Sequence, residues 1–356
     1  MADRPDKWCK QSLIDWGVDT THEIGRFPQS REVPATTARK LFGTFSRYID
    51  QVKVAYAIKY GALPEIELVG GSAVIEEPEA PSLQVDEKPP TDLRDDVVVV
   101  LPDTHFPFHD PEAVEVAMRI VEHYRPGRVV HLGDLLDCGP FSSHGGNTID
   151  EVRSYDFVEM EIKPAREMIK RGLKACGHWV QSDGNHEYRV QRSCIKHGIP
   201  GVELYNATQP EKLLFDGIPD ARFTHIPYIK SVKDSSHGYW ITPNLLAVHG
   251  WSFSQNAAAT HLRYAKSVSV VYGHCHRVDL AMERCPMTGR IIQAFCPGTL
   301  SLLQPIYFTD GRPTSWVQGV SVIFISENNP EDWTQYQIQI HDGRAILPDG
   351  TAITAS

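Results

Sequence analysis

Five short apolar segments dominate the pattern of this chain, and each runs into a loop with metal-capable side chains. The first, 97–101, is a continuous run of valines ending in leucine, which is typical of a strand buried on both faces. We predict four more such strands, at 128–132, 179–182, 245–248 and 268–272. Because ligand sites in α/β sheets lie beyond the carboxyl ends of the strands, the five loops are expected to meet in one polar cluster.

The candidate ligands in these loops are imidazole, carboxylate and amide groups, namely Asp103, His105, Asp134, Asn185, His249, His274 and His276. This donor set suits borderline or hard divalent ions. At an extended strand end, residues i and i+2 point the same way, so Asp103 and His105 can reach one ion together. The same spacing separates His274 and His276. The two carboxylate oxygens of Asp134 could bridge a pair of ions.

A single one of these motifs carries little weight, because Asp-x-His and His-Gly pairs occur by chance in many chains. The complete series is Asp103-x-His105, Gly133-Asp134-x-x-Asp137, Gly184-Asn185-His186-Glu187, His249 and Gly273-His274-x-His276. In this order it resembles the calcineurin-like metallophosphoesterase family, over about 97–356. The resemblance implies an α/β (α+β) sandwich in which two mixed β-sheets pack face to face and are flanked by helices.

The resemblance also implies a role for each residue of the series. Asp103, His105 and His276 would hold one metal ion, and the other ion would be held by Asn185, His249 and His274. Asp134 would bridge the two ions. His186 would be the acid that protonates the leaving group, and Asp137 would orient it by accepting a hydrogen bond.

The chemistry of such a site agrees with these roles. Two divalent ions clamp a phosphate and lower the pKa of a bridging water, so that a hydroxide can attack phosphorus in line. The leaving alkoxide needs a proton, and a histidine with a carboxylate partner is suited to supply it. Mn²⁺ is the expected ion, while Fe, Zn²⁺, Ni²⁺ or Mg²⁺ also fit the donors.

One position departs from the Ser/Thr protein phosphatase branch of that family. There the second motif continues with an arginine that grips the phosphate, whereas this chain has Cys138, so a bidentate clamp is lost. Arg189, His109 and His144 could compensate as substrate-binding residues. The alternative for each of these three is a surface or loop-packing role.

Other segments bear on the subfamily. Two segments resemble phage- and prophage-borne members of the family that are described as DNA-repair-exonuclease-like. They are Gly184-Asn185-His186-Glu187-Tyr188-Arg189 and His249-Gly250-Trp251. The expected substrate is therefore a phosphodiester in a nucleotide or nucleic acid, which makes the protein a phosphodiesterase or nuclease. A phosphomonoesterase or Ser/Thr-type protein phosphatase is the alternative, and a catalytically silent binding protein is a third.

Outside the catalytic region, residues 1–65 are expected to form a small helical segment, with helices at 38–45 and 48–58. Gly25-Arg26-Phe27-Pro28 followed by the first of these helices resembles a small helical repeat attached to some homing endonucleases, which would suggest nucleic-acid binding. A docking helix hairpin is the other interpretation. Residues 66–96 are rich in acids and proline and are expected to be a linker to the catalytic domain, 97–356.

Several further elements follow from periodicity. A helix is expected at 111–124 with Asp110 as its N-cap, and a longer one at about 149–174. A strand is expected at 291–295. The alternating segments 320–325 and 333–340 favour a more antiparallel second sheet.

Composition limits where such a protein would work and what it binds. The seven cysteines form no C-x-x-C pair, and no apolar run approaches the roughly 18 residues needed to span a bilayer. We therefore expect a cytoplasmic protein without membrane contact, in the host cytoplasm if phage-encoded. The net charge is −10 and no long basic stripe exists, so strong nonspecific binding to duplex nucleic acid is not expected. The oligomeric state stays open.

Overall fold

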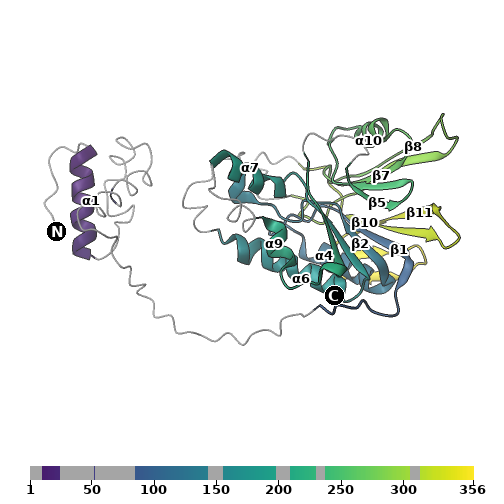
Figure 1. Ribbon diagram of the computed structural model, residues 1–356, viewed down its shortest axis with the longest axis horizontal. Helices are drawn as coiled ribbons and strands as arrows, with labels where there is room; N and C mark the ends of the chain where they lie inside the picture. The colour runs from purple at the N-terminus through teal and green to yellow at the C-terminus, as the bar shows by residue number, and fades with distance from the viewer. Residues whose placement is uncertain are drawn as a thin grey trace. The chain divides into compact units, whose positions relative to one another are not determined.

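The computed structural model describes residues 10–24, 52, 85–142, 155–197, 209–229, 237–304 and 313–356. The chain divides into two compact units, Met1–Pro81 and Ser82–Ser356. In the first unit the described helix is α1 (Lys10–Ile24), which buries Leu13 and Val18 (Figure 1). The helices expected at 38–45 and 48–58 lie outside the described residues except Val52, as does the segment 25–28.

The first sheet of the second unit has six strands in the order β11-β10-β1-β2-β3-β4. Strands β1 to β4 are mutually parallel, while β10 pairs antiparallel with both β1 and β11. The five residues 97–101 are fully buried, as their continuous apolar run predicts. The strands are β1 (Arg94–Leu101), β2 (Pro126–His131), β3 (His178–Ser182), β4 (Phe223–Ile226), β10 (Gly319–Ser326) and β11 (Asn329–Gln339).

The second sheet has five strands in the order β5-β6-β7-β9-β8. Its three inner strands are parallel, and its edge strands β5 and β8 pair antiparallel. The strands are β5 (Tyr239–Thr242), β6 (Leu245–Val248), β7 (Ser269–Tyr272), β8 (Val278–Arg284) and β9 (Ile291–Pro297). A separate two-stranded ribbon consists of β12 (Arg344–Ile346) and β13 (Ala352–Thr354).

The expectation for the alternating tail was wrong. Its two strands, β10 and β11, do not form a second sheet but complete the first one, where Val97 pairs with Phe324 and Val100 with Ser321. Alternation predicts antiparallel pairing, which is what β10 and β11 show, but it cannot specify the third strand to which a hairpin adds. That strand is β1, more than 200 residues earlier in the chain.

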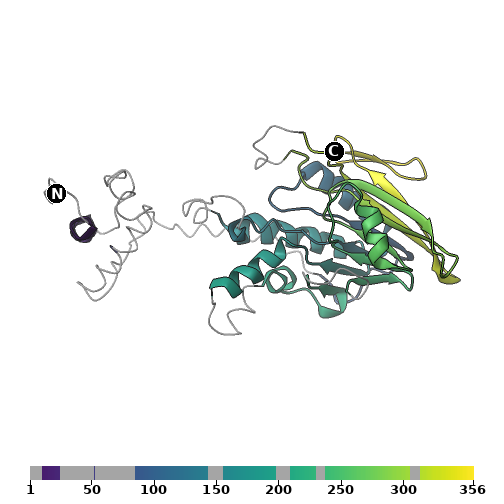
Figure 2. The same cartoon turned by 90° about the horizontal axis from the view of Figure 1, so that it is seen from above.

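The two sheets pack face to face, which confirms the expected fold class (Figures 1 and 2). Their inner faces share one apolar cluster, to which β1 contributes Val98 and Val100 and β6 contributes Leu245 and Ala247. This alternation along each strand leaves the other faces free to receive helices.

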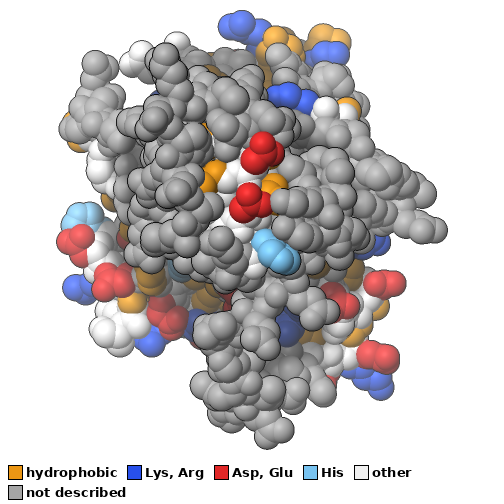
Figure 3. Space-filling view, turned by 90° about the vertical axis from the view of Figure 1, so that its left-hand side faces the viewer, with side chains coloured by type: hydrophobic (Ala, Val, Ile, Leu, Met, Phe, Trp, Pro, Cys, Tyr) orange, Lys and Arg blue, Asp and Glu red, His pale blue; other side chains and the backbone are white. Residues whose placement is uncertain are grey.

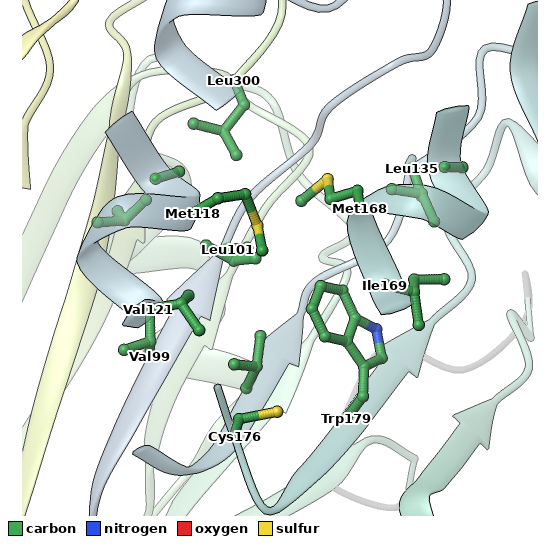
Figure 4. Packing of buried hydrophobic residues seen from close by; sticks show 14 of the residues in the cluster. Val99, Leu101, Met118, Val121, Leu135, Met168, Ile169, Cys176, Trp179 and Leu300 are labelled. Carbon is green, nitrogen blue, oxygen red and sulfur yellow. The ribbon is translucent and has the colours of Figure 1, made fainter. Parts of the chain in front are cut away.

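Helices cover both outer faces of this sandwich. Against the first sheet, Met118 and Val121 lie beside Leu101 and Val99 (Figure 4). The second sheet is covered by α10 (Figure 1). The helical elements are α4 (Pro111–Tyr124), η1 (Gly139–Phe141), η2 (Val158–Ile162), α6 (Lys163–Leu173), α7 (Glu187–His197), α9 (Pro210–Phe215), η3 (Asp220–Arg222) and α10 (Ala257–Ala265). Within the described parts of the chain, no helix is long and apolar enough to cross a bilayer.

The prediction for α4 is confirmed at both ends. Asp110 caps it by accepting hydrogen bonds from the backbone N–H groups of Glu112 and Ala113, at 3.0 and 3.1 Å, and Pro111 opens the first turn. The helix expected at 149–174 is described from residue 155 onward, where the π-helical turn η2 leads into α6. In α6, Gly172 permits close packing, because a Cβ there would lie 2.4 Å from the Trp179 ring.

Candidate metal centre

The loops that follow β1, β2, β3, β6 and β7 meet at one end of the sandwich, as the sequence predicts. Their donor atoms form three groups, and the atoms of each lie within 4.8 Å of one another. The groups are Asp103, His105, Asp134 and His276; Asp134, His249 and His274; and His105, Asp137 and His186. Buried Asp and His groups of this kind can hold metal ions.

In the first group, two imidazoles and two carboxylates point at one place. His276 Nε2 lies 3.0 Å from Asp103 Oδ2 and 3.1 Å from His105 Nε2, and His105 Nε2 lies 3.7 Å from Asp134 Oδ2. Burial raises the pKa of Asp103, but His276 and His249 lower it by a larger amount. The resulting pKa is about 2, so the carboxylate is ionised. Nitrogen lone pairs and anionic oxygens directed at one point fit a divalent cation.

The second group is built around His249. Its Nε2 lies 3.0 Å from the amide oxygen of Asn185 and 3.4 Å from Asp134 Oδ2. Its Nδ1 lies 3.2 Å from the carbonyl of Leu132, which can accept the Nδ1 proton and leave the Nε2 lone pair directed at the group. The ring of His274 is 5.1 Å away. Asp134 thus belongs to both groups, at the position where a bridging ligand is expected.

Four of these residues have an unusual backbone. His105, Asp134, His274 and His276 have φ values of +57°, +49°, +69° and +55°. A non-glycine residue in this region costs about 1–3 kcal/mol and persists only where its surroundings hold it in place. Here the carbonyl of Asp134 accepts hydrogen bonds from the N–H groups of Thr104 and His105, both at 2.9 Å. The conformation turns the ligand side chains toward a common centre.

Glu187 is a structural residue of the site to which the sequence assigns no role. Its buried carboxylate accepts hydrogen bonds from the N–H groups of Gly184, Leu136 and Asp134, at 2.7, 2.9 and 3.2 Å. It thereby ties the loop after β2 to the loop after β3. The two loops touch closely, because a Cβ on Gly184 would lie 2.0 Å from Asp134 Oδ1.

The third group contains the proposed acid. His186 Nδ1 lies 2.9 Å from the carbonyl of Asp137 and 3.2 Å from its Oδ1, and His186 Nε2 lies 3.8 Å from Asp134 Oδ2. Burial lowers the pKa of His186, but Asp134 and the hydrogen bond to Asp137 raise it above the ordinary value. Arg189 donates to His186 Nε2 at 2.9 Å and to the Asp137 carbonyl at 2.8 Å. The structure thus brings Arg189 to His186 and Asp137.

Behind Asp137, the position of the phosphatase arginine is occupied by a buried side chain. Cys138 is fully buried, and its N–H donates to Glu161 Oε2 at 2.7 Å. Tyr155 donates its hydroxyl proton to the other carboxyl oxygen at 2.5 Å. Burial raises the pKa of Glu161 to about 8. The Cys138 side chain therefore belongs to the interior.

The remaining expected substrate contacts are less central. His109 pairs with Ser301 in an isolated β-bridge, and its ring lies 4.3 Å from that of Phe106. It belongs to none of the three groups, so loop packing describes its role here. His144 lies outside the described residues.

Comparison with known proteins gives distant similarities. The chain is 24% identical over 243 residues to the Gene 54 protein of Mycobacterium phage L5, covering 64% of this chain and 88% of that protein. It is also 24% identical over 247 residues to the Gene 54 protein of Mycobacterium phage D29, covering 65% and 90%. No known family model matches the chain.

The chain is also similar, at low TM-scores, to solved structures. A Vps29 single mutant from Entamoeba histolytica has a TM-score of 0.31 and 16% identity, covering 69% of this chain and 94% of that one. The NAD nucleotidase NadN of Haemophilus influenzae has a TM-score of 0.33 and 9% identity, covering 72% and 53%. The fold class itself follows from the strand order and packing described above.

Proposed function

We propose that this protein is a metal-dependent phosphoester hydrolase of the calcineurin-like metallophosphoesterase type, with two divalent ions at the cluster. The observation that carries the proposal is Asp134, whose carboxylate is shared by two convergent groups of buried donors. The similarity to phage proteins supports a phage-type member. A host-cytoplasmic location and the DNA-repair-exonuclease-like subtype belong to the same proposal.

The ligands divide between the two ions according to the groups. Asp103, His105 and His276 would hold one ion. The other would be held by Asn185, His249 and His274, with Asp134 between them. Bound there, Mn²⁺ or a similar ion would neutralise phosphoryl oxygens and make water a stronger acid.

The acid step belongs to His186. Asp137 holds Nδ1, which leaves Nε2 as the nitrogen on the side of Asp134. In this role the protonated ring gives its Nε2 proton to the leaving oxygen of the substrate. Because Nε2 accepts a hydrogen bond from Arg189 in this arrangement and so carries no proton there, the substrate must first displace Arg189 so that Nε2 can hold the proton that it gives, and the displaced guanidinium becomes available to a phosphoryl oxygen nearby.

A phosphodiester is the favoured substrate class, because the buried Cys138 leaves no arginine at the position that grips a monoester in phosphoprotein phosphatases. The described surface also bears on nucleic acid. Among the side chains coloured in Figure 3, Lys and Arg lie at several separate places, with Asp and Glu among them, rather than along one stripe. The sequence itself has no long basic stripe, which favours single-stranded or nucleotide substrates over long duplex.

The test compares substrates on metal-loaded protein. The chain is stripped with a chelator, reloaded with Mn²⁺, and assayed on bis(p-nitrophenyl) phosphate, p-nitrophenyl phosphate and labelled single- and double-stranded DNA and RNA. We expect metal-dependent diester cleavage and two ions per chain by elemental analysis. Activity on the monoester alone would establish the alternative phosphomonoesterase. Two bound ions without any hydrolysis would indicate the silent binding protein.

The appendage is tested in the same assay. A chain without residues 1–81 should keep its activity on bis(p-nitrophenyl) phosphate, because every proposed ligand lies in the second unit. If the first unit binds nucleic acid, cleavage of DNA or RNA should fall in this variant. Equal cleavage of all substrates would favour the docking role.

A further inference from the structure

A recess adjoins the metal centre at the edge where β4 of one sheet and β6 of the other end. The recess is open to solvent, and its empty space is about 400 Å³ when the adjoining solvent is included. The segments that line it are 182–183 after β3, 226–229 at the end of β4, 237–238 before β5, and 248–251 at the end of β6. His249 is part of this lining, so the recess and the proposed metal site share a side chain.

Aromatic rings border the recess. The ring of Tyr228 lies 6.0 Å from that of His249 at 78°, and 5.6 Å from that of Tyr188. Trp251 lines the recess and packs on His261, with ring centroids 4.4 Å apart. Burial raises the pKa of Tyr228, as do the nearby Asp134 and Tyr188, so its hydroxyl stays protonated within electrostatic reach of the bridging carboxylate. Flat apolar surfaces therefore lie directly beside the site of phosphate chemistry.

The lining also offers hydrogen-bonding groups. The carboxylate of Asp183 is held by His225, with Nε2 and Oδ1 3.0 Å apart, and lines the recess. The indole N–H of Trp251 is buried and has no hydrogen-bond partner among the described residues. Gly238 lines the recess with backbone alone. A larger residue does not fit at this position, because a Cβ there would lie 2.5 Å from the carbonyl oxygen of Ala247. Polar groups at the border of an aromatic surface match a nucleobase, which has a π-face and a hydrogen-bonding edge.

We propose that this recess binds the base of a nucleotidyl phosphoester, against Tyr228, while the phosphate lies at the metal centre. The inference rests on the proposed hydrolase function and adds the place where the base of the substrate binds. A second aromatic group supports the same class: Phe253, which is 72% exposed, lies 5.5 Å from the ring of His274. A base on the other side of the scissile phosphate could stack there.

Two esters with the same leaving group isolate the recess. Thymidine 5′-(p-nitrophenyl phosphate) and methyl p-nitrophenyl phosphate differ only in the nucleoside, so their ratio of kcat/KM reports what the nucleoside contributes. With Mn²⁺ we expect the nucleotidyl ester to be preferred by roughly 5- to 150-fold, the range of base–aromatic stacking. Tyr228→Leu should lower kcat/KM for the nucleotidyl ester far more than for the methyl ester and so remove most of this preference, whereas Tyr228→Phe, which keeps the ring, should retain it.

Ile195→Ala is the matched control, since this exposed apolar residue lies on α7 and does not line the recess. It should leave the preference unchanged. Equal kcat/KM for the two esters, or an equal loss of kcat/KM on both esters in Tyr228→Leu, would overturn the proposal that the recess binds a base. The hydrolase proposal would remain intact. Hydrolysis of neither ester by the metal-loaded wild-type protein would overturn the proposed function itself.

Discussion

Strand β1 joins two buried regions of opposite chemistry. Val99 and Leu101 lie in the apolar core against α4, while Asp103, two residues further on, lies among histidines, and all three are fully buried. In the core, burial is favourable by itself, at about 25 cal/mol per Å² of apolar surface. In the cluster, burial of a charge is unfavourable unless partners compensate it. The apolar core is thus stabilised by the packing of its side chains, whereas the polar cluster consists of buried charged groups that a cation can bind.

The sharpest test of this contrast is a pair of substitutions, one in each region. Asp134→Asn removes the shared charge of the cluster, and we expect kcat/KM to fall at least on the order of 10⁴-fold, since groups that act as a unit lose their effect together. Metal content should fall in parallel. Leu101→Ala should instead lower the free energy of unfolding by about 2–5 kcal/mol and leave the folded protein able to bind metal.

Elemental analysis, steady-state kinetics and urea unfolding on both variants give the comparison. The two regions would not be separable if Leu101→Ala lost metal while still folded. The role of Asp134 as the shared ligand would fail if Asp134→Asn kept two ions and full activity.

The next substitution separates acid chemistry from metal binding inside the polar region. His186→Asn should lower kcat by roughly 10²–10³-fold on an ester with an alkyl leaving group, because general acid catalysis contributes on this scale. The loss should be much smaller with p-nitrophenyl, which leaves without a proton. Metal content should not change. Lys196→Gln, at an exposed position on α7, the helix that begins directly after His186, is the control. Equal losses on both leaving groups would remove the acid role.

A substitution of Glu187 tests whether metal binding in the polar region depends on the hydrogen bonds that hold the ligand loops in place. Glu187→Gln keeps the size of the side chain but replaces one acceptor oxygen with a donor, so it cannot accept all three N–H groups of the two loops. We expect metal affinity to fall by about 10–100-fold, as is common when partners of ligands are lost. Titration with Mn²⁺ measures the effect. An unchanged affinity would show that the two loops hold their positions without this carboxylate.

The sequence predicts the strands and ligand loops of these two regions, but not the contacts between distant parts of the chain. The core strands and the ligand loops follow from local patterns, because a β-branched run predicts a buried strand and parallel strands bring their carboxyl ends to one edge. The hydrogen bonds of Glu187 depend on two loops that lie close together in space, and no local sequence pattern encodes that closeness. The recess depends on β4 and β6, which belong to different sheets.

The edge strands of the second sheet, β5 and β8, were not predicted from the sequence. Leu280 and Met282 on β8 are 52% and 57% exposed, and Trp240 on β5 is 43% exposed, so neither strand shows the inside–outside alternation that marks a strand in a sequence. The tail hairpin was recognised, but its attachment to β1 is a long-range pairing. Tertiary packing determines which strands pair, and the strand propensities of individual residues carry no information about it.

The last expected effect depends on pH and concerns Glu161, a buried carboxyl next to the polar region. Burial raises its pKa from 4.5 to about 8, so its contribution to stability is full below pH 4.5 and is lost as the pH rises through 8. Glu161→Gln cannot titrate. The difference in unfolding free energy between variant and wild type should therefore grow in favour of the variant from pH 5 to 9, by a few kcal/mol at about 1.4 kcal/mol per pKa unit.

Urea unfolding of metal-free protein across this range measures the difference. Glu159→Gln, on the same helical turn but exposed, is the matched control. A constant difference for Glu161→Gln would mean that this carboxyl is already ionised at pH 5. Tyr155 and the Cys138 N–H would then compensate a buried charge without a cation, and metal would no longer be what distinguishes the cluster from its surroundings.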